Sequence, residues 1–169
     1  GPGFGGSCFK KDISNLIYIC NHYGLSEVAS YWEKVILINQ WQQKRISKII
    51  VEKLFGNLSE KKIAILGFAF KSNTNDTRES PAISICKDLL EEGCFLSIYD
   101  PKVEINQIQN DLFKNGDDNS KVCVASTIQE SVKNADAIIL LTEWEEFKKI
   151  NWDEIVPLMR KPSWLFDTR

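Results

Sequence analysis

The sequence has few of the residues from which membrane spans, metal centres and disulfide frameworks are built. It contains no apolar run of about 18 residues, so we expect no membrane-spanning helix. The single histidine and the five cysteines, none of them in a C-x-x-C pair, argue against a zinc site, any other metal or a disulfide framework. Reduced thiols fit a cytoplasmic protein. Cys20, Cys86 and Cys123 stand among apolar neighbours, so we expect them to be buried as small hydrophobic residues.

No charge of one sign dominates the chain either. The formal net charge is −2, which gives no reason to expect a nucleic acid or a membrane surface as partner. The first residues are rich in glycine rather than apolar, so we expect no signal peptide. A chain of 169 residues can nevertheless bury a substantial core, which corresponds to one domain or slightly more.

The most informative segment is residues 3–12, which read Gly-Phe-Gly-Gly-Ser-Cys-Phe-Lys-Lys-Asp. Glycines allow backbone conformations with positive φ and a close approach to a ligand. The apolar spacing of residues 12–23 predicts a helix. Cys8 would then lie just ahead of the helix start, where the amide dipoles and the ammonium groups of Lys10 and Lys11 favour the thiolate. The pattern indicates a nucleophilic cysteine; the alternative is a loop thiol with no role.

A second helix is predicted from residue 26 to about residue 55, because no proline or glycine interrupts this stretch. About 30 residues make a helix near 45 Å long, which exceeds the usual globular range. Four consecutive apolar residues, 35–38, point in most directions around its axis and must be covered on several sides. This favours a central spacer helix whose middle is also a subunit interface. The alternative is a core helix hidden inside one domain.

After residue 61 short apolar runs alternate with helical patterns. We expect strands at 62–67, 95–99, 122–125, 137–141 and 164–166. Ser80 and Pro81 predict the start of a helix that runs to residue 92. Helical or turn segments are expected at 107–120, 131–134, 145–148 and 152–159, the first as a helix remnant and a loop. The alternation predicts an α/β fold with a parallel sheet, whose strand-end loops gather at one rim where ligands bind.

The loop after the first predicted strand differs from a dinucleotide-binding turn. It reads Gly67-Phe-Ala-Phe-Lys71 and lacks the second and third glycines of G-x-G-x-x-G. It also runs from residue 67 to residue 80, which is longer than such a turn. We therefore expect no intact dinucleotide site in this sheet. Lys71 and Arg78 are suited to bind phosphate oxygens, although they could also be ordinary exposed loop charges.

Taken in order, the motifs resemble those of the UDP-glucose/GDP-mannose dehydrogenase family over essentially the whole chain. They are the glycine-rich cysteine segment, Gly67-Phe-Ala-Phe-Lys71, Asp76-Thr-Arg-Glu-Ser-Pro81, Tyr99-Asp-Pro-Lys-Val103, Thr142-Glu-Trp144 and Phe166-Asp-Thr-Arg169. The likeness is greatest to members that act on UDP-glucose. The chain departs from the family at Lys10, where many bacterial relatives carry proline, and at Thr168, where glycine is usual.

The resemblance implies an α/β fold in which a long central helix leads into a Rossmann-like parallel sheet of the UDP-binding type. It divides the chain into residues 1–60, with the active-site cysteine loop and the central dimerisation helix, and residues 61–169, a truncated nucleotide-sugar-binding domain. Thr142-Glu-Trp144 is interpreted as structural. The family's NAD-binding domain precedes this region and is absent from the sequence, so we expect a fragment that is inactive alone.

The activity implied by the resemblance is oxidation of the C6 alcohol of UDP-glucose to the carboxylate of UDP-glucuronate, with NAD as cofactor. Cys8 would form a thiohemiacetal and then a thioester. Asp12 would manage the proton and water, and Lys11 would add positive potential. The resemblance also implies substrate-binding and cofactor-binding residues. For substrate these are Gly5, Gly6, Phe9, Phe70, Lys71 and Arg169, and for the cofactor Arg78.

The expected partners are a UDP-sugar substrate and a second copy of the chain, joined through the central helix. Three alternatives remain open from the sequence. The substrate could be GDP-mannose or a UDP-N-acetylhexosamine. The chain could instead be a non-catalytic nucleotide-binding or dimerisation module. A receiver-like signalling domain is a third alternative that the long leading helix and the loop chemistry support little.

Overall fold

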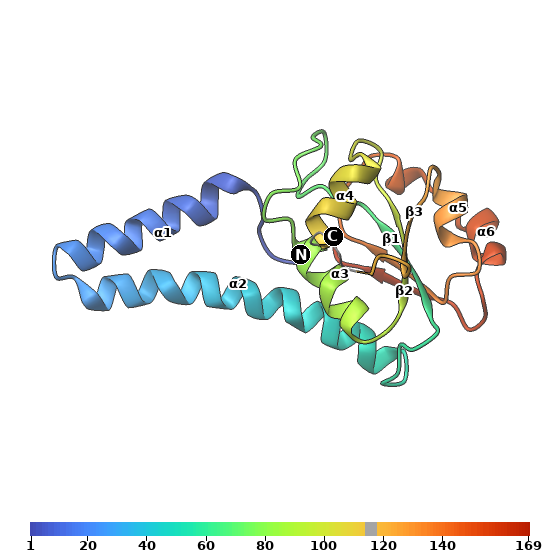
Figure 1. Cartoon of the computed structure of the whole chain (residues 1–169), viewed down its shortest axis with the longest axis horizontal. Helices are drawn as coiled ribbons and strands as arrows, with labels where there is room; N and C mark the ends of the chain where they lie inside the picture. The colour runs from blue at the N-terminus through green and yellow to red at the C-terminus, as the bar shows by residue number, and fades with distance from the viewer. Residues whose placement is uncertain (114–117) are drawn as a thin grey trace.

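The computed structural model describes residues 1–113 and 118–169 and consists of a helical hairpin that projects from an α/β sheet (Figure 1). The hairpin is formed by α1 (Ser7–His22) and α2 (Ser26–Lys53), which pack side by side in opposite directions. Gly24, at φ 72°, lies in the turn between them, as its position after the predicted helix suggested. Part of the polar stretch predicted at 107–120 lies outside the described residues.

The start of α1 differs from the prediction, because the helix begins at Ser7 rather than at residue 12. Gly6 occupies the N-cap position at φ 87°, and no side chain caps the helix. The usual start signal, a serine, threonine, aspartate or asparagine at the N-cap, is therefore missing, and the sequence pattern alone placed the start too late. Cys8 consequently lies in the first turn of α1 and not ahead of it.

The sheet contains five parallel strands in the order β3-β2-β1-β4-β5, which is the order of a doubly wound, Rossmann-like fold. Their bounds are β1 Lys62–Leu66, β2 Phe95–Tyr99, β3 Val122–Val124, β4 Ala137–Leu140 and β5 Trp164–Asp167. Residues Ile63 to Leu66 of β1 are fully buried, as expected for the central strand of a parallel sheet. The predicted α/β fold is confirmed, with each strand within one residue of its predicted ends.

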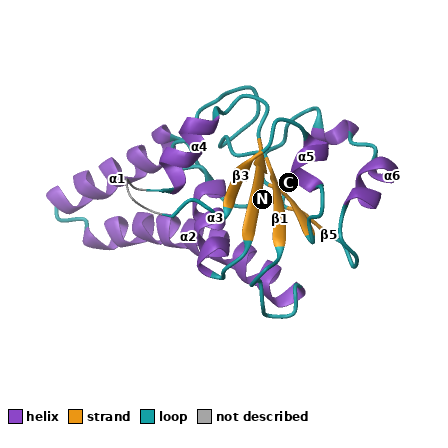
Figure 2. Ribbon diagram, turned by 45° about the vertical axis from the view of Figure 1, so that its right-hand side comes forward, coloured by secondary structure: helices purple, strands orange, loops and turns teal. Residues whose placement is uncertain are grey.

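Helices cover both faces of this sheet. Figure 2 shows α2, α3 (Pro81–Glu91) and α4 (Ile105–Leu112) on one side, with α5 (Ile128–Val132) and α6 (Trp152–Ile155) on the other. Two 3₁₀ segments, Phe147–Lys149 and Val156–Leu158, complete the connections. The predicted start of α3 is confirmed: Ser80 is the N-cap, its hydroxyl accepts a hydrogen bond from the Ala82 N–H, and Pro81 is the first helical residue.

The long helix α2 connects the hairpin to the core of the sheet domain. Near its carboxyl end Ile50 is buried, and the following Leu54 and Leu58 belong to the same apolar core. In its middle, by contrast, Leu37 and Ile38 are exposed. Within the described chain, α2 is therefore not a helix hidden inside one domain.

The five cysteines are all free thiols, and their burial corrects one prediction. Cys20, Cys86 and Cys94 are buried, whereas Cys8 and Cys123 are exposed. The prediction for Cys123 was wrong because β3 is an edge strand and its middle residue faces solvent. Apolar neighbours in sequence do not reveal which strand lies at an edge.

The loops that follow the strands gather at one rim of the sheet, as predicted. The Gly67 N–H donates to the Tyr99 carbonyl at 2.8 Å, and the Leu141 N–H donates to the Leu66 carbonyl at 2.9 Å. The Thr168 hydroxyl donates to the Leu140 carbonyl at 2.6 Å.

In the part of the chain that the structure describes, no helix is long and apolar enough to cross a membrane.

Candidate active site

The segment that carries Cys8 packs directly against the loop between β1 and α3. The Gly6 N–H donates a hydrogen bond to the Arg78 carbonyl at 2.9 Å. A Cβ atom at Gly6 would lie 2.9 Å from Cε2 of the Phe70 ring, and one at Gly5 would lie 2.4 Å from the Glu79 carbonyl oxygen. Real Cβ atoms do not approach that closely, so these two contacts require glycine. They bring the cysteine segment to the rim of the sheet.

Cys8 is exposed in the first turn of α1, together with Lys11 and Asp12 in the next turn. Because residues three and four apart share one side of a helix, these three side chains project from the same face. The thiol also lies within electrostatic reach of a cation. The pKa of Arg78 is raised above its usual value mainly by a hydrogen bond to Asp76, with a smaller electrostatic contribution from Cys8.

Arg78 is held by a two-pronged contact with Asp76. Its Nε donates to Asp76 Oδ1 at 3.0 Å and its Nη2 to Oδ2 at 2.7 Å. This hydrogen bonding to Arg78 lowers the pKa of the Asp76 carboxyl. The Arg78 side chain is still 69% exposed, so the carboxylate fixes the direction of a guanidinium that faces solvent. An oriented, exposed guanidinium is suited to bind an anion.

Arg169 joins three parts of the rim. Its Nε donates to the Leu141 carbonyl at 2.8 Å and its Nη2 to the Phe70 carbonyl at 3.3 Å. Its Nη1 pairs with Glu143 Oε2 at 3.0 Å. The structure thus brings Phe70 and Arg169 together, although 99 positions separate them in the sequence. Lys71 is exposed, with its ammonium 5.4 Å from the centre of the Phe70 ring.

The Asp100 carboxylate connects separate loops of the rim through hydrogen bonds. Its Oδ2 accepts hydrogen bonds from the N–H groups of Phe68 and Ala69 and from Trp144 Nε1, at 2.7, 3.0 and 3.1 Å. Its Oδ1 accepts from the N–H groups of residues 102 and 103. Thr142 donates to the Ala69 carbonyl at 2.6 Å. These contacts support the structural interpretation of Thr142-Glu-Trp144.

The same contacts support the expectation that this sheet holds no dinucleotide. In a dinucleotide-binding Rossmann fold, an acidic residue binds the cofactor ribose, and the first glycine turn admits the pyrophosphate. Here both oxygens of Asp100, at the end of β2, are engaged by the protein itself. The space beside Gly67 is filled by Thr142, whose Cβ lies 2.5 Å from where a Gly67 Cβ would be. The residues of this rim therefore do not fit NAD.

Other predicted residues have fewer contacts with the rim. The Phe9 ring is 51% exposed and meets the Phe4 ring edge to face, with centroids 4.7 Å apart. Among the described residues, no hydrogen bond or ion pair joins Lys11 or Asp12 to the rim. In the same residues no group of three or more histidine, cysteine or acidic side chains is placed to hold a metal ion.

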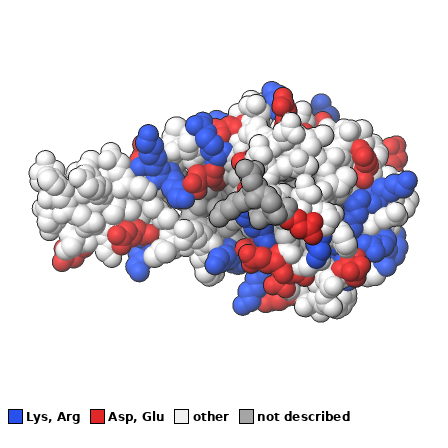
Figure 3. Space-filling model, viewed as in Figure 1, with Lys and Arg blue, Asp and Glu red and all other residues white. Residues whose placement is uncertain are grey.

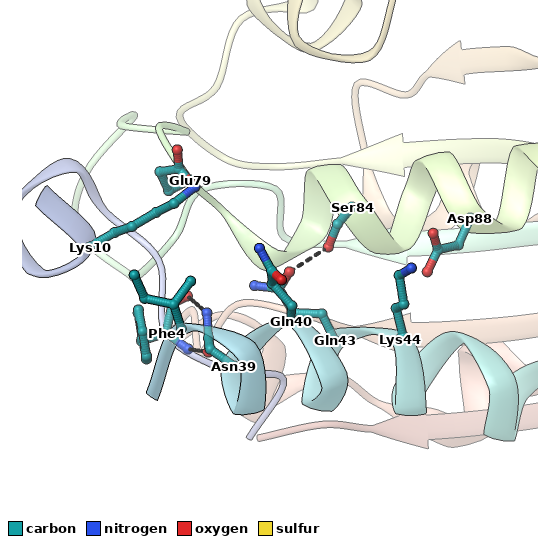
Figure 4. A pocket seen from close by; sticks show the side chains of 10 residues that line it. Phe4, Lys10, Asn39, Gln40, Gln43, Lys44, Glu79, Ser84 and Asp88 are labelled. Atoms are coloured by element: carbon teal, nitrogen blue, oxygen red, sulfur yellow. Dashed lines mark hydrogen bonds and ion pairs between the residues drawn. The ribbon is translucent and has the colours of Figure 1, made fainter. Parts of the chain in front are cut away.

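Two residues at the site were missed by the sequence analysis. Figure 4 shows Asn39 of α2 beside Phe4, and Lys10 reaching Glu79, around a cavity of about 380 Å³ between the cysteine segment, α2 and α3. Asn39 is an ordinary polar residue of a helix in the sequence, and its contact with Phe4 spans 35 positions, so no local pattern marks it. Glu79 is part of the Asp76-Thr-Arg-Glu-Ser-Pro81 motif, which signals its neighbourhood but not its partner.

Comparisons with known proteins agree with this geometry. Residues 64–169 match the "UDP-glucose/GDP-mannose dehydrogenase family, UDP binding domain", and residues 1–41 match the central domain of the same family. The chain is 50% identical over 173 residues to UDP-glucose 6-dehydrogenase of Drosophila melanogaster and 48% identical over 181 residues to UDP-glucose 6-dehydrogenase 2 of Arabidopsis thaliana. Each match covers 99% of this chain, but only 36% and 38% of the length of the two relatives.

Solved structures show the same fold. The structure of a UDP-glucose dehydrogenase from Pyrobaculum islandicum aligns with the whole of this chain over 35% of its own length, with a TM-score of 0.80 and 27% identity. The structure of GDP-mannose dehydrogenase from Pseudomonas aeruginosa aligns with 98% of this chain over 36% of its own length, with a TM-score of 0.72 and 23% identity. Since the UDP-binding-domain match alone covers more than half of a chain whose cysteine segment packs against the rim, the chain belongs to the UDP-glucose/GDP-mannose dehydrogenase family.

Proposed function

We propose that the chain is the central-helix and UDP-binding part of an NAD-dependent UDP-glucose 6-dehydrogenase, which oxidises UDP-glucose to UDP-glucuronate. The observation that carries this proposal is the packing of the Cys8 segment against Phe70 and the Arg78–Glu79 backbone. This packing supports a role for Cys8 as a nucleophile beside cationic side chains that are suited to bind a sugar diphosphate. The relatives that are 45–50% identical are UDP-glucose 6-dehydrogenases, which favours UDP-glucose over other nucleotide sugars.

Cys8 is assigned as the nucleophile of the second oxidation. Its sulfur adds to the C6 aldehyde and gives a thiohemiacetal, because an aldehyde carbon has to become tetrahedral before it can lose another hydride. Loss of that hydride leaves a thioester on Cys8, and water then releases the carboxylate and the free thiol. NAD, held elsewhere in the protein, supplies the hydride acceptor for both oxidations.

Lys11 and Asp12 are assigned to support this chemistry. Asp12 follows Cys8 by four positions on the same face of α1 and would take up the proton and orient the water for thioester hydrolysis. Lys11 adds positive charge near the thiolate. The start of α1 at Ser7 supports these roles, because only a helix that includes residues 8–12 presents all three groups on one side.

The substrate is proposed to bind between the cysteine segment and the rim. Gly5 and Gly6 let the backbone approach closely, and Phe9 shapes the same segment. The other proposed substrate contacts are Phe70, Lys71 and Arg169, of which Lys71 and Arg169 carry the positive charge that a diphosphate requires. Arg78, oriented outward by Asp76, is proposed to reach the cofactor.

The proposed partner is a second copy of the chain, joined through α2. Leu37, Ile38 and Trp41 are 51%, 64% and 62% exposed in the middle of this helix, and large apolar side chains gathered on one surface indicate an interface. We further propose the division into residues 1–60, with the cysteine loop and the dimerisation helix, and residues 61–169, the nucleotide-sugar-binding domain.

A chimera tests the proposed activity. In it, this chain replaces the matching segment of the Drosophila melanogaster relative, which supplies the remaining part of the enzyme. We expect the chimera to form NADH and UDP-glucuronate from UDP-glucose, and Cys8→Ser to lower the rate of carboxylate formation at least about a thousandfold. Cys123→Ser, which alters the other exposed thiol, is the matched control and should leave the rate unchanged. Undiminished product formation by the Cys8→Ser chimera would contradict the proposal.

A further inference from the structure

The Cys8 segment is held by α2 as well as by the rim, and the contact is made by Asn39 (Figure 4). The Phe4 N–H donates to Asn39 Oδ1 at 2.7 Å, and Asn39 Nδ2 donates to the Phe4 carbonyl at 3.1 Å. Both main-chain polar groups of Phe4 are therefore paired with one side-chain amide. Both contacts are partly buried, which makes each group costly to leave without a partner.

The backbone beside Phe4 passes close to the same amide. A Cβ atom at Gly3 would lie 2.5 Å from Asn39 Oδ1, so the segment runs directly over the side chain. One turn further along α2, Gln42 Nε2 donates to the Gly1 carbonyl at 2.8 Å. The first four residues are thus aligned along α2.

Two contacts with the rim lie on either side of Cys8 in the sequence. Before it, the Gly6 N–H donates to the Arg78 carbonyl at 2.9 Å. After it, Lys10 Nζ pairs with Glu79 Oε2 at 2.7 Å. The side chains of Lys10 and Glu79 are 41% and 48% exposed, and ion pairs of this kind contribute little stability. The partly buried amide of Asn39 is therefore a stronger polar anchor of the segment than this ion pair.

The choice of residue at position 39 points in the same direction. Asparagine is a poor helix former compared with leucine or alanine, and position 39 lies in the interior of the 28-residue helix α2. Here the side chain satisfies Phe4 rather than the helix itself. A locally unfavourable residue that serves a distant segment is typical of a functional constraint.

We propose that Asn39 is a positioning residue for Cys8. By holding both main-chain groups of Phe4, it fixes the segment that ends at Gly6, the N-cap of α1, and thereby the place of the thiol relative to Arg78. Asn39 acts through the backbone and touches no reacting atom. The inference rests on the proposed role of Cys8 as nucleophile, and it names a residue outside the family motifs quoted above.

Loss of the amide has a defined consequence. Gly6 offers no side-chain cap, so the first turn of α1 depends on the segment before it for its geometry. When Phe4 is released, that turn frays, and Cys8 is no longer held at the helix start beside the segment that contacts Arg78. The alkylation rate of Cys8 should fall about two- to fivefold, the range expected for loss of a helix-terminus interaction.

The chain itself provides the internal standards for measuring this rate. Each cysteine is quantified by mass spectrometry after timed treatment with iodoacetamide near neutral pH. Cys123 is exposed on an edge strand of the sheet and serves as the reference thiol. Cys86 and Cys94 are 0% exposed, so their labelling reports unfolding.

We expect Asn39→Leu to lower the Cys8 to Cys123 rate ratio two- to fivefold while Cys86 and Cys94 stay protected. Asn21→Leu makes the same change at an exposed position of α1 and should leave the ratio unchanged. An unchanged or increased ratio in folded Asn39→Leu overturns the proposal.

If Asn39→Leu exposes the buried cysteines, Asn39→Asp decides the question. The aspartate still accepts from the Phe4 N–H but cannot donate to the Phe4 carbonyl, so a smaller fall in the ratio is expected. A ratio equal to that of the unmodified chain overturns the proposal in this case too.

The labelling result is independent of turnover, and this separates the two proposals. In the chimera, Asn39→Leu should lower kcat and change KM for UDP-glucose little, because the substrate contacts remain in place. If Cys8→Ser leaves the chimera active, the proposed function fails. If Cys8→Ser abolishes turnover and Asn39→Leu changes neither the labelling ratio nor kcat, the positioning role alone fails.

Discussion

Gly67 is the residue at which the central strand turns into the rim of the site. It has a φ of 94°, and a Cβ atom there would lie 2.5 Å from Thr142 Cβ and 2.7 Å from the Thr142 N atom. The second of these is a backbone atom, which cannot turn aside as a flexible side chain can. Thr142 is in turn fixed by its hydrogen bond to the Ala69 carbonyl. Close contact and positive φ together require glycine at this position.

Gly67→Ala should lower the free energy of unfolding by about 3 kcal/mol or more, since it combines left-handed backbone strain with a clash in packed surroundings. Gly56→Ala is the matched control. It has a φ of 72° but nothing within 4 Å of the added Cβ, so about 1 kcal/mol of strain alone is expected. Urea unfolding of both variants measures the difference, and equal losses would contradict the steric argument.

Tyr99, at the end of β2, makes the stability of the chain depend on alkaline pH. Burial raises the pKa of its phenol to about 12, and the nearby carboxylate of Glu146 acts in the same direction. The folded state therefore favours the neutral phenol, whereas in the unfolded chain the group ionises near the usual value of about 10. Its contribution to stability is complete below about pH 10 and is lost as the pH rises toward about 12.

Tyr99→Phe should remove this contribution. The unfolding free energy of the variant is expected to decline less steeply between about pH 10 and about pH 12 than that of the unmodified chain. Urea unfolding at several pH values across this interval measures both slopes. Parallel slopes would show that Tyr99 does not titrate differently in the two states.

Among the elements, the helical hairpin formed by α1 and α2 exposes several large apolar side chains. Its free end carries no Asp, Glu, Lys or Arg from Ile13 to Ser26, and Figure 3 shows that end of the molecule as mostly white. Large apolar residues there are exposed, and they are Tyr18, Ile19, Tyr23, Leu25, Val28 and Tyr31. Exposed apolar patches often mark interaction sites, and this one is continuous along the hairpin with the α2 surface proposed above as an interface.

Trp41→Glu should weaken self-association of the chain, because it puts a charge into the middle of the proposed α2 interface. The dissociation constant is expected to rise at least about tenfold, as is common when an interface tryptophan is lost. Sedimentation velocity over a concentration series measures it. Phe55→Glu, at an aromatic residue that is 77% exposed beyond the end of α2, should leave association unchanged. Equal effects of the two changes would argue against α2 as the interface.

The elements that were predicted well are those with strong local signals. The buried run of β1 and the Ser80-Pro81 start of α3 are written in consecutive residues, so their ends were predicted closely. The start of α1 was missed because a glycine N-cap carries no side-chain signal. The exposure of Cys123 was missed because the edge position of β3 follows from strand order, which a single strand does not encode.

The site was predictable to the extent that its motifs lie at strand ends. Parallel strands bring such loops together, and Gly67, Asp100 and Thr142 do meet at the rim. The partners of the charged residues were not predictable. The pairing of Arg169 with Glu143 and the contact of Asn39 with Phe4 depend on how separate elements pack, and no spacing in the sequence reports it.

At the scale of the whole molecule, the chain has the architecture of a nucleotide-binding domain without the turn that binds a dinucleotide. The strand order is Rossmann-like, but Thr142 fills the space beside Gly67, and Asp100 is engaged by the backbone. The chain on its own should therefore retain a site for the substrate side of the reaction and lack one for the cofactor.

Purified alone, the chain should form no NADH from UDP-glucose and NAD⁺. NAD⁺ should leave its melting temperature unchanged, whereas UDP is expected to raise it, since a ligand that binds only the folded state stabilises that state. Differential scanning fluorimetry with each ligand measures this. A preparation from cells that lack the native enzyme provides the control for contaminating activity. A rise in melting temperature with NAD⁺ would contradict the interpretation of the rim.

Helix α2 runs without interruption from the free end of the hairpin to the buried Ile50. It therefore moves as a rigid rod that is anchored at one end in the sheet domain. A helix of 28 residues is about 42 Å long, so a tilt of about 5° at the anchored end displaces the far end by about 4 Å. Conversely, a second protein bound at the far end could change the tilt of α2 by a few degrees with little force. Such a small change in tilt would alter the distance between the Cys8 sulfur and the rim.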